Sequence, residues 1–129
     1  MRQKILLLLF VLLPLVVNAE VINGIHYDLH FLYNSDDSTY YPEATVISNP
    51  NNKYSGNICI PESVICNGHT YTVTGIDDAF IGCEDLITVT LPNSIRYIYS
   101  SFKDCTNLTS INIPNSVTLI YPETFKNCI

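Results

Sequence analysis

The spacing of apolar side chains follows three different patterns along this chain. Residues 5–17 form an unbroken apolar run, whereas residues 24–33 alternate between apolar and polar side chains. From residue 58 onward, similar apolar positions return at a period of 22 or 23 residues. A period of this length is typical of a stack of coils, in which each coil buries its apolar positions against the next.

The repeated copies align on their cysteines. The first copy, 76–97, reads "IDDAFIGCEDLITVTLPNSIRY", and the second, 98–119, reads "IYSSFKDCTNLTSINIPNSVTL". A partial third copy, 120–129, reads "IYPETFKNCI" and has one extra residue before its Phe. The recurring positions predicted to face the interior of the stack are Phe80, Cys83, Leu86, Leu91, Phe102, Cys105, Leu108, Ile113, Phe125 and Cys128.

Each full copy predicts a short strand, a turn, and an irregular or short helical return. In the first copy Leu86, Val89 and Leu91 would point inward from the strand. Pro92 would end the strand, because proline lacks an N–H for the ladder and has a fixed φ. The predicted fold class is therefore mainly β, with a short solenoid of about 2.5 coils.

An earlier segment, "ICIPESV" at 58–64, matches part of the repeat and then departs from it. Asn67-Gly68 follows between two β-prone runs and predicts a hairpin, because both residues tolerate the positive φ of a type I′ turn. Residues 58–75 are interpreted as a modified first coil with an added hairpin. We expect this hairpin to cover the open end of the stack.

Residues 20–57 contain no repeat and predict a small β cap. The alternating segment 24–33 predicts a strand with Ile25 and Tyr27 on its apolar face. Residues 34–44 are turn-rich and predict a loop, residues 44–48 a second strand, and residues 49–57 another loop. A strand pair or meander packed on the first coil is the simplest arrangement.

The order of the repeated residues resembles the BspA-type leucine-rich repeat. The resemblance rests on Leu86, Val89, the segment Leu91-Pro92-Asn93-Ser94-Ile95, Cys105 and Leu108, and it covers residues 58–129. Two copies are one residue short between Ile and Phe, and fewer repeats are present than the family commonly stacks. The resemblance implies a leucine-rich repeat solenoid in a secreted or surface-attached binding module, in some members an adhesin, with no catalytic residues.

The N-terminus has the three parts of a secretory signal peptide. "MRQK" is a basic n-region, residues 5–17 form the apolar h-region, and small side chains precede a cleavage site after Ala19. The apolar run is short for a membrane span. We expect residues 1–19 to be removed and the protein to be secreted or held at the cell surface, with no transmembrane span after cleavage.

Cleavage would leave four basic and twelve acidic side chains. Nucleic acid and anionic lipid both require basic patches, so neither is an expected partner. An extracellular protein or a glycan is the expected ligand class, and no cofactor is implied. The odd number of cysteines, five, does not match a simple disulfide framework, and three of them follow the repeat period. Cys59 and Cys66 are the pair for which oxidation stays open.

Three groups of residues have side chains suited to chemistry. His26, Asp28 and His30 would share one face of a strand and could bind a metal, but a solvated polar face explains them better. Ser94 and Ser116 lack a neighbouring His, so their hydroxyls are expected to satisfy backbone groups instead. The acidic pairs Asp77-Asp78 and Glu84-Asp85 are too sparse to predict calcium. No catalytic or metal-binding residue is predicted.

The favoured function is a non-catalytic binding or adhesion module whose ligand contacts the outward face of the strands. Two alternatives stay open. The sequence stops before the Leu and strand that follow Cys83 and Cys105, so the chain could be a structural or capping fragment without a ligand. A small hydrolase or metal-binding protein has no supporting motif. The candidate ligand-binding residues are Asn57, Thr88, Thr90, Ser110 and Asn112, with Cys59 beside them.

Overall fold

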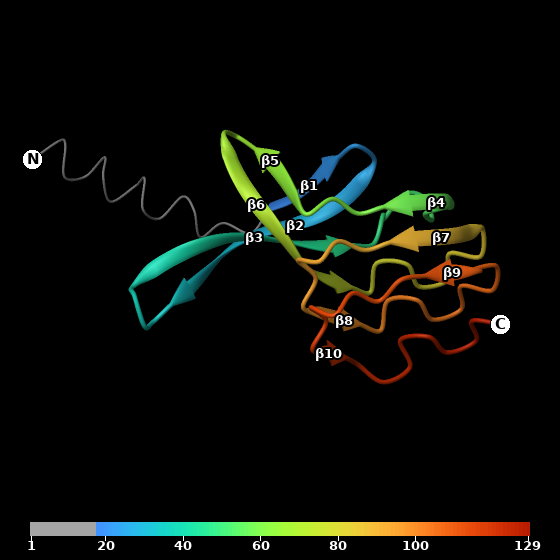
Figure 1. Cartoon of the computed structure of the whole chain (residues 1–129). Coiled ribbons are helices and arrows are strands. Elements are labelled where there is room, and N and C mark those ends of the chain that lie inside the picture. The colour runs from blue at the N-terminus through green and yellow to red at the C-terminus, as the bar shows by residue number, and fades with distance from the viewer. Residues whose placement is uncertain (1–17) are drawn as a thin grey trace, which may run out of the picture.

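The computed structural model describes residues 18–129, which form ten strands and no helix. The strands belong to two sheets that stack against each other over most of the repeat region (Figure 1). In chain order they are β1 (Asn18–Ile22), β2 (Ile25–Asn34), β3 (Thr39–Ile47), β4 (Gly56–Cys59), β5 (Ser63–Cys66), β6 (His69–Asp77), β7 (Leu86–Thr90), β8 (Tyr97–Tyr99), β9 (Ser110–Ile111) and β10 (Leu119–Ile120).

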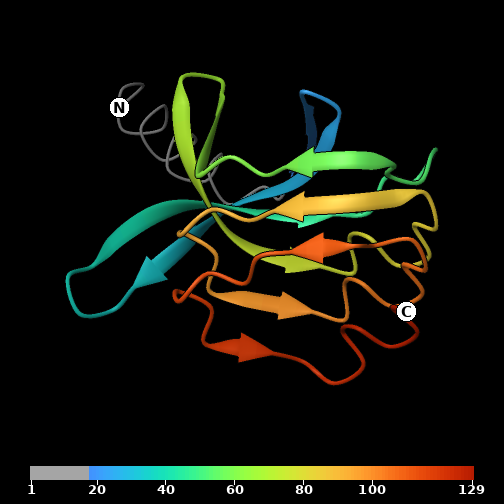
Figure 2. The ribbon, with the colours of Figure 1, turned by 45° about the vertical axis from the view of Figure 1, so that its right-hand side comes forward.

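The repeat region is a solenoid with a parallel strand series on each side. Strands β4, β7 and β9 pair in parallel and form a three-stranded sheet. Strands β6, β8 and β10 also pair in parallel, within a larger seven-stranded sheet. The two series run in opposite directions with the core between them (Figure 2). The predicted solenoid is confirmed. Of the two predicted forms of the return, irregular or short helical, the structure shows the irregular one, with a short strand in each return.

The rest of each return is a run of turns that contains two left-handed residues. The first of these lies two positions before the repeated Phe, at Asp78, Ser100 and Glu123. The second directly precedes the repeated Cys, at Gly82, Asp104 and Asn127. Residues with positive φ interrupt a right-handed helix, which is why no helix forms here. The turns instead bond to the next coil, with the N–H of Phe80 donating to Ser101 O (3.0 Å) and that of Phe102 to Thr124 O (2.9 Å).

The N-terminal region is an antiparallel meander of β1, β2 and β3 that continues the seven-stranded sheet, because β3 pairs in parallel with β6. The predicted first strand corresponds to β2. The predicted loop at 34–44 is partly wrong, since β3 begins at Thr39 and Tyr40 pairs with Tyr33. Pro42 is tolerated there because β3 pairs with β6 only from Glu43 onward, so the missing N–H removes no bond from that ladder.

The predicted hairpin at Asn67-Gly68 is confirmed. Both residues have positive φ, 49° and 78°, and Cys66 pairs with His69 across the turn. The expected position of the hairpin is wrong, however. The hairpin residues, 63–66 and 69–72, pair with each other and project from the stack (Figure 2), and only the later part of β6, Gly75–Asp77, pairs with β8 in the second parallel series.

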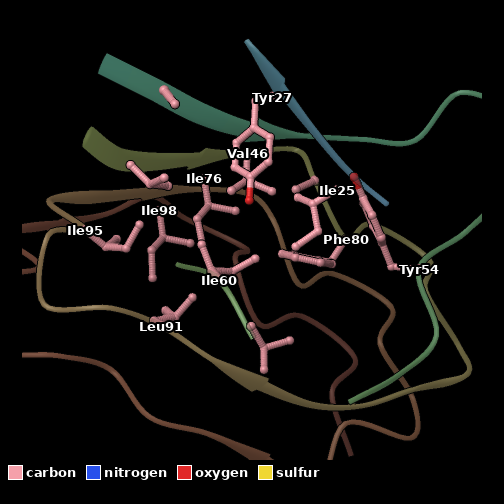
Figure 3. Packing of buried hydrophobic residues seen from close by; sticks show 14 of the residues in the cluster. Ile25, Tyr27, Val46, Tyr54, Ile60, Ile76, Phe80, Leu91, Ile95 and Ile98 are labelled. Atoms are coloured by element: carbon pink, nitrogen blue, oxygen red, sulfur yellow. The ribbon is translucent and has the colours of Figure 1, made fainter. Parts of the chain in front are cut away.

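The end of the core is closed by the meander and by Tyr54. Tyr27 and Val46 lie beside Ile76, and the ring of Tyr54 packs on Phe80 with centroids 5.1 Å apart (Figure 3). The hydroxyl of Tyr54 accepts a hydrogen bond from the N–H of His26 (2.9 Å) and donates one to Ile47 O (2.9 Å). Burial raises the pKa of this hydroxyl, so it stays a donor at neutral pH.

Polar side chains tie the meander to the first full repeat. Glu43 on β3 is only 8% exposed, and its carboxylate accepts hydrogen bonds from Arg96 Nη1 (3.2 Å) and Thr74 Oγ1 (2.9 Å). The hydroxyl of Tyr97 on β8 reaches across β6 to Thr45 Oγ1 (2.7 Å). A buried carboxylate without hydrogen-bond partners would destabilise the fold. The contacts with Arg96 and Thr74 therefore allow Glu43 to be buried.

Burial of the repeat positions decreases toward the last coil. Leu86, Phe102 and Cys105 are completely buried, whereas Leu108, Phe125 and Cys128 are only partly buried. Ile113 is 39% exposed, although its counterpart Leu91 is buried. The predicted interior position of Ile113 is therefore wrong, because within residues 18–129 no later coil covers it.

All five cysteines are free thiols, so the open question of a Cys59–Cys66 disulfide is answered against pairing. Cys59 is exposed on β4, while Cys66 lies on β5 in the other sheet. The repeat cysteines form an inward column, in which Cys105 Sγ donates to Phe80 O (3.0 Å) and Cys128 Sγ donates to Phe102 O (2.9 Å). Burial raises the pKa of Cys105 to about 12 and also raises that of Cys83, which keeps both protonated.

We therefore expect the thiols to differ in reactivity. In the native protein a thiol-specific reagent should modify Cys59 first, whereas Cys83 and Cys105 should react only after denaturation, because they are buried and protonated. Mass spectrometry of peptides after timed labelling measures each site. Modification of Cys83 or Cys105 at the rate of Cys59 would contradict the buried column.

Candidate functional site

The predicted ligand-binding residues lie on the outer side of β4, β7 and β9, which we call the polar face. Parallel pairing places Asn57 opposite Thr88, and Thr88 opposite Ser110, so these three form one column. Cys59 pairs with Thr90 in the neighbouring column. The structure thus brings together Asn57, Cys59, Thr88, Thr90 and Ser110, and Thr88 is the only one of them that is half-buried.

The polar face is partly occupied by its own hydrogen bonds. Thr88 Oγ1 donates to Asn57 Oδ1 (2.7 Å), which joins two coils through side chains. The amide of Asn112 accepts a bond from the N–H of Leu91 (3.2 Å) and donates one to Leu91 O (3.3 Å). Asn112 therefore extends the backbone ladder beyond the two-residue strand β9, and a ligand would have to compete for its amide.

The chemistry available on the polar face is hydrogen bonding to a neutral surface. The hydroxyls of Thr90 and Ser110 are exposed and make no hydrogen bond to another residue within 18–129. Apart from the Cys59 thiol, the six residues of this face carry no titratable group. Such a surface can contact hydroxyl and amide groups of a ligand, but it gives little electrostatic steering.

The histidines and the acidic residue of β2 lie together on the side of the sheet away from the core. Asp28 Oδ1 and His30 Nδ1 are buried atoms that find no hydrogen-bond partner within the described chain. Across residues 18–129 no group of three or more His, Cys, Asp or Glu side chains has the arrangement needed to hold a metal ion.

The two repeat serines differ from each other. Ser94 Oγ donates to Glu62 O at 3.4 Å, a long bond that agrees with the expected backbone contact. Ser116 Oγ is buried and finds no partner among residues 18–129, so the expectation is wrong for Ser116. The residue of the preceding coil that corresponds to Glu62 is Asn93, and Ser116 Oγ makes no hydrogen bond to its carbonyl.

One surface group was missed by the sequence analysis. Asp77, Tyr99 and Tyr121 each follow a matched isoleucine of the repeat, and they line up along the outside of the second parallel series. Reading the residue after each of these isoleucines as one column would have found them. These three side chains differ in chemistry from copy to copy, so the alignment of the copies did not mark their position as a recurring one.

The N-terminal segment lies mostly outside the described residues, so the predicted signal peptide is not visible in the structure. Asn18 and Ala19 are the exception, since they form the first two residues of β1 and pair with Leu29 and Asp28. Cleavage after Ala19 would leave Glu20–Ile22 of this strand paired with β2. Between residues 18 and 129 there is no helix long and apolar enough to span a membrane.

Two parallel strand series, a proline-ended strand in each coil and columns of buried Leu, Phe and Cys define the class of leucine-rich repeat proteins. The model of the family described as "BspA type Leucine rich repeat region (6 copies)" matches residues 51–129, which is more than half of the chain. The chain belongs to this family. A comparison with curated proteins finds no significant match.

Two solved structures share this architecture. One is a leucine-rich repeat protein from Bacteroides ovatus, with 25% identity and a TM-score of 0.56 over 88% of this chain. The other is a leucine rich cell surface protein from Faecalibacterium prausnitzii, with 25% identity and a TM-score of 0.57 over 81% of this chain. The match covers 27% of the length of each of these proteins.

Proposed function

We propose that the protein is a non-catalytic binding or adhesion module that works outside the cell or at its surface. The observation that carries this proposal is the register of the polar face, which aligns Asn57, Thr88 and Ser110 into one outward-facing column across three coils. Membership of the BspA-type family supports it, and so does the similarity to a protein described as a cell surface protein. The basic and apolar N-terminus supports export.

The chemistry of the polar face favours an extracellular protein or glycan as ligand. Its short hydroxyl and amide groups can exchange hydrogen bonds with sugar hydroxyls or with a polar protein surface. Thr90 and Ser110 are the residues we expect to contact the ligand first, because their hydroxyls are exposed and not used within the fold. Asn112 contributes through its position more than through its amide, which already bonds to Leu91.

The test is a double substitution, Thr88→Arg with Ser110→Arg, on neighbouring coils of one column. We expect the exported protein to bind at least one member of a solid-phase panel of matrix proteins and mucin glycans. The double variant should lose that binding, because two long cationic side chains would cover the column. A matched control, Asn93→Arg with Asn115→Arg, adds the same charge at exposed turn positions of the same two coils and should keep the binding.

Circular dichroism and thermal melting show whether each variant is folded. Retained binding by the folded Thr88→Arg, Ser110→Arg variant would show that the polar face is not the site. Equal loss in both double variants would show that added charge, and not this face, is responsible. A parent protein that binds no member of the panel would contradict the adhesion function.

A further inference from the structure

The outside of the second parallel series carries an exposed pair of tyrosines. Tyr99 ends β8, and Tyr121 directly follows β10 in the next coil, where its N–H donates to Ile98 O (3.0 Å). The two rings lie 4.4 Å apart between centroids and are inclined by 58°. Their residues are 41% and 37% exposed. We call Tyr99 and Tyr121 the tyrosine pair.

The tyrosine pair does not form part of the hydrophobic core. The preceding residue of β8, Ile98, is completely buried on the inner side, so Tyr99 points to the opposite side of the strand. Leu119, which pairs with Tyr97, is also exposed and extends the apolar surface. A group of large apolar side chains exposed on a surface often marks a site of contact with another molecule.

One edge of this surface is acidic. Asp77 is the direct strand neighbour of Tyr99, and Asp78 follows it with a positive φ. Burial raises the pKa of Asp77, and the carboxylates of Asp78 and Asp28 raise it further. In the described chain none of these three carboxylates forms a salt bridge, and Arg96 is paired with Glu43 instead (3.2 Å).

We propose that the tyrosine pair and Asp77 form a recognition site for a lysine or arginine side chain of a basic segment in a partner protein. Aromatic faces attract cations within about 6 Å of the ring centroid, and Arg is the more frequent partner. A carboxylate next to the rings supplies the charged acceptor for the same group. This site differs from the polar face in its sheet, its side chains and its ligand chemistry.

The charge of the surroundings selects a cationic partner over a neutral sugar. Burial and, to a smaller extent, the carboxylates of Asp78 and Asp28 raise the pKa of Asp77, and a bound cation would favour its charged form. Titratable groups whose pKa is shifted in the free protein are often found at binding sites. The six residues named on the polar face include no carboxylate and no aromatic ring, so we do not expect them to bind basic peptides.

The experiment measures binding of fluorescein-labelled peptides by anisotropy. The probes are an octapeptide of alternating Arg and Gly, and matched peptides with Gln or Glu in place of Arg. We expect the exported protein to bind the Arg peptide more tightly than the Gln peptide, to lose affinity as salt is added, and not to bind the Glu peptide. Salt screening weakens this contact because the site is exposed.

Three variants assign the binding to the site. Tyr99→Ala with Tyr121→Ala should weaken binding of the Arg peptide about tenfold, from the loss of ring contacts. Asp77→Asn should weaken it several-fold and reduce its salt dependence. The control, Tyr33→Ala with Tyr40→Ala, removes another exposed pair, whose centroids lie 5.0 Å apart near Asp36 and Asp37, and should leave binding unchanged.

Each other outcome overturns the proposal. Equal affinity for the Arg and Gln peptides would show that no cation is recognised. Equal loss in the two tyrosine double variants would show a general effect of aromatic side chains. If the Tyr99, Tyr121 variant did not fold, Asp77→Asn with unchanged affinity and salt dependence would still refute the site. Displacement of the Arg peptide by a neutral oligosaccharide would assign the surface to glycans instead.

Discussion

Replacing Phe102 with alanine is expected to remove a large share of the free energy of unfolding of the solenoid. Its ring is completely buried and stacks between Phe80 (5.1 Å) and Phe125 (5.4 Å), with the three planes nearly parallel. Truncation of a buried Phe destabilises a protein by about 3–5 kcal/mol, through lost contacts and the cavity that remains. Small domains have a total free energy of unfolding of about 5–15 kcal/mol. Urea unfolding followed by circular dichroism measures the effect.

Two comparisons make this result specific to the column of rings. Phe125→Ala should destabilise less than Phe102→Ala, because Phe125 is only partly buried at the end of the column. Lys103→Ala should change stability by less than about 1 kcal/mol, because its pairing with Glu123 (3.6 Å) is exposed to solvent. Similar unfolding midpoints for Phe102→Ala and Lys103→Ala would refute the register of the repeats.

The second large effect is expected at Gly75, where substitution by alanine should destabilise the protein by about 1–3 kcal/mol. Gly75 pairs directly with Tyr97, and a Cβ at this position would overlap the tyrosine ring at Cζ. The ring would have to move and give up its hydroxyl contact with Thr45 (2.7 Å), which ties the repeat to the meander. The backbone of Gly75 does not have a positive φ, so the effect comes from the ring and not from backbone strain.

A double-mutant cycle tests this cause. In a Tyr97→Ala background the Gly75→Ala change should be nearly neutral, because the overlapping ring is gone. Thermal or urea unfolding of the four proteins gives the coupling energy, which we expect to be about 1–3 kcal/mol. Additive effects would mean that Gly75 is required for another reason.

The parts of the fold that repeat could be predicted from the sequence. The recurrence of Phe, Cys and Leu identified the interior of each coil, and Leu86, Phe102 and Cys105 are completely buried in the structure. Asn67-Gly68 predicted the type I′ hairpin, because its positive φ values are a local property of these two residues. The alternation of residues 24–33 predicted β2 for the same kind of reason.

The candidate site could be predicted only in outline. The alignment of copies placed Asn57, Thr88 and Ser110 in one column, and the observed register agrees. The repeat pattern did not show that the amide of Asn112 bonds to Leu91, because that bond joins two different coils. The sequence did not predict the exposed pair Tyr99 and Tyr121. The residues that recur in every copy are mostly buried ones, whereas the residues on the outer surface differ between copies.

The sequence by itself determined the period of the stack, the inward side of each coil and the two residues that form the hairpin turn. These features depend on residues that are close in the chain, or on contacts that are repeated between each coil and the next. Only the tertiary structure decided which element closes the core, how exposed Ile113 is, and how Glu43 and Tyr97 link the meander to the repeats. Such contacts join segments that are distant in sequence. Their energy depends on the register between sheets, which a local pattern of apolar and polar residues does not specify.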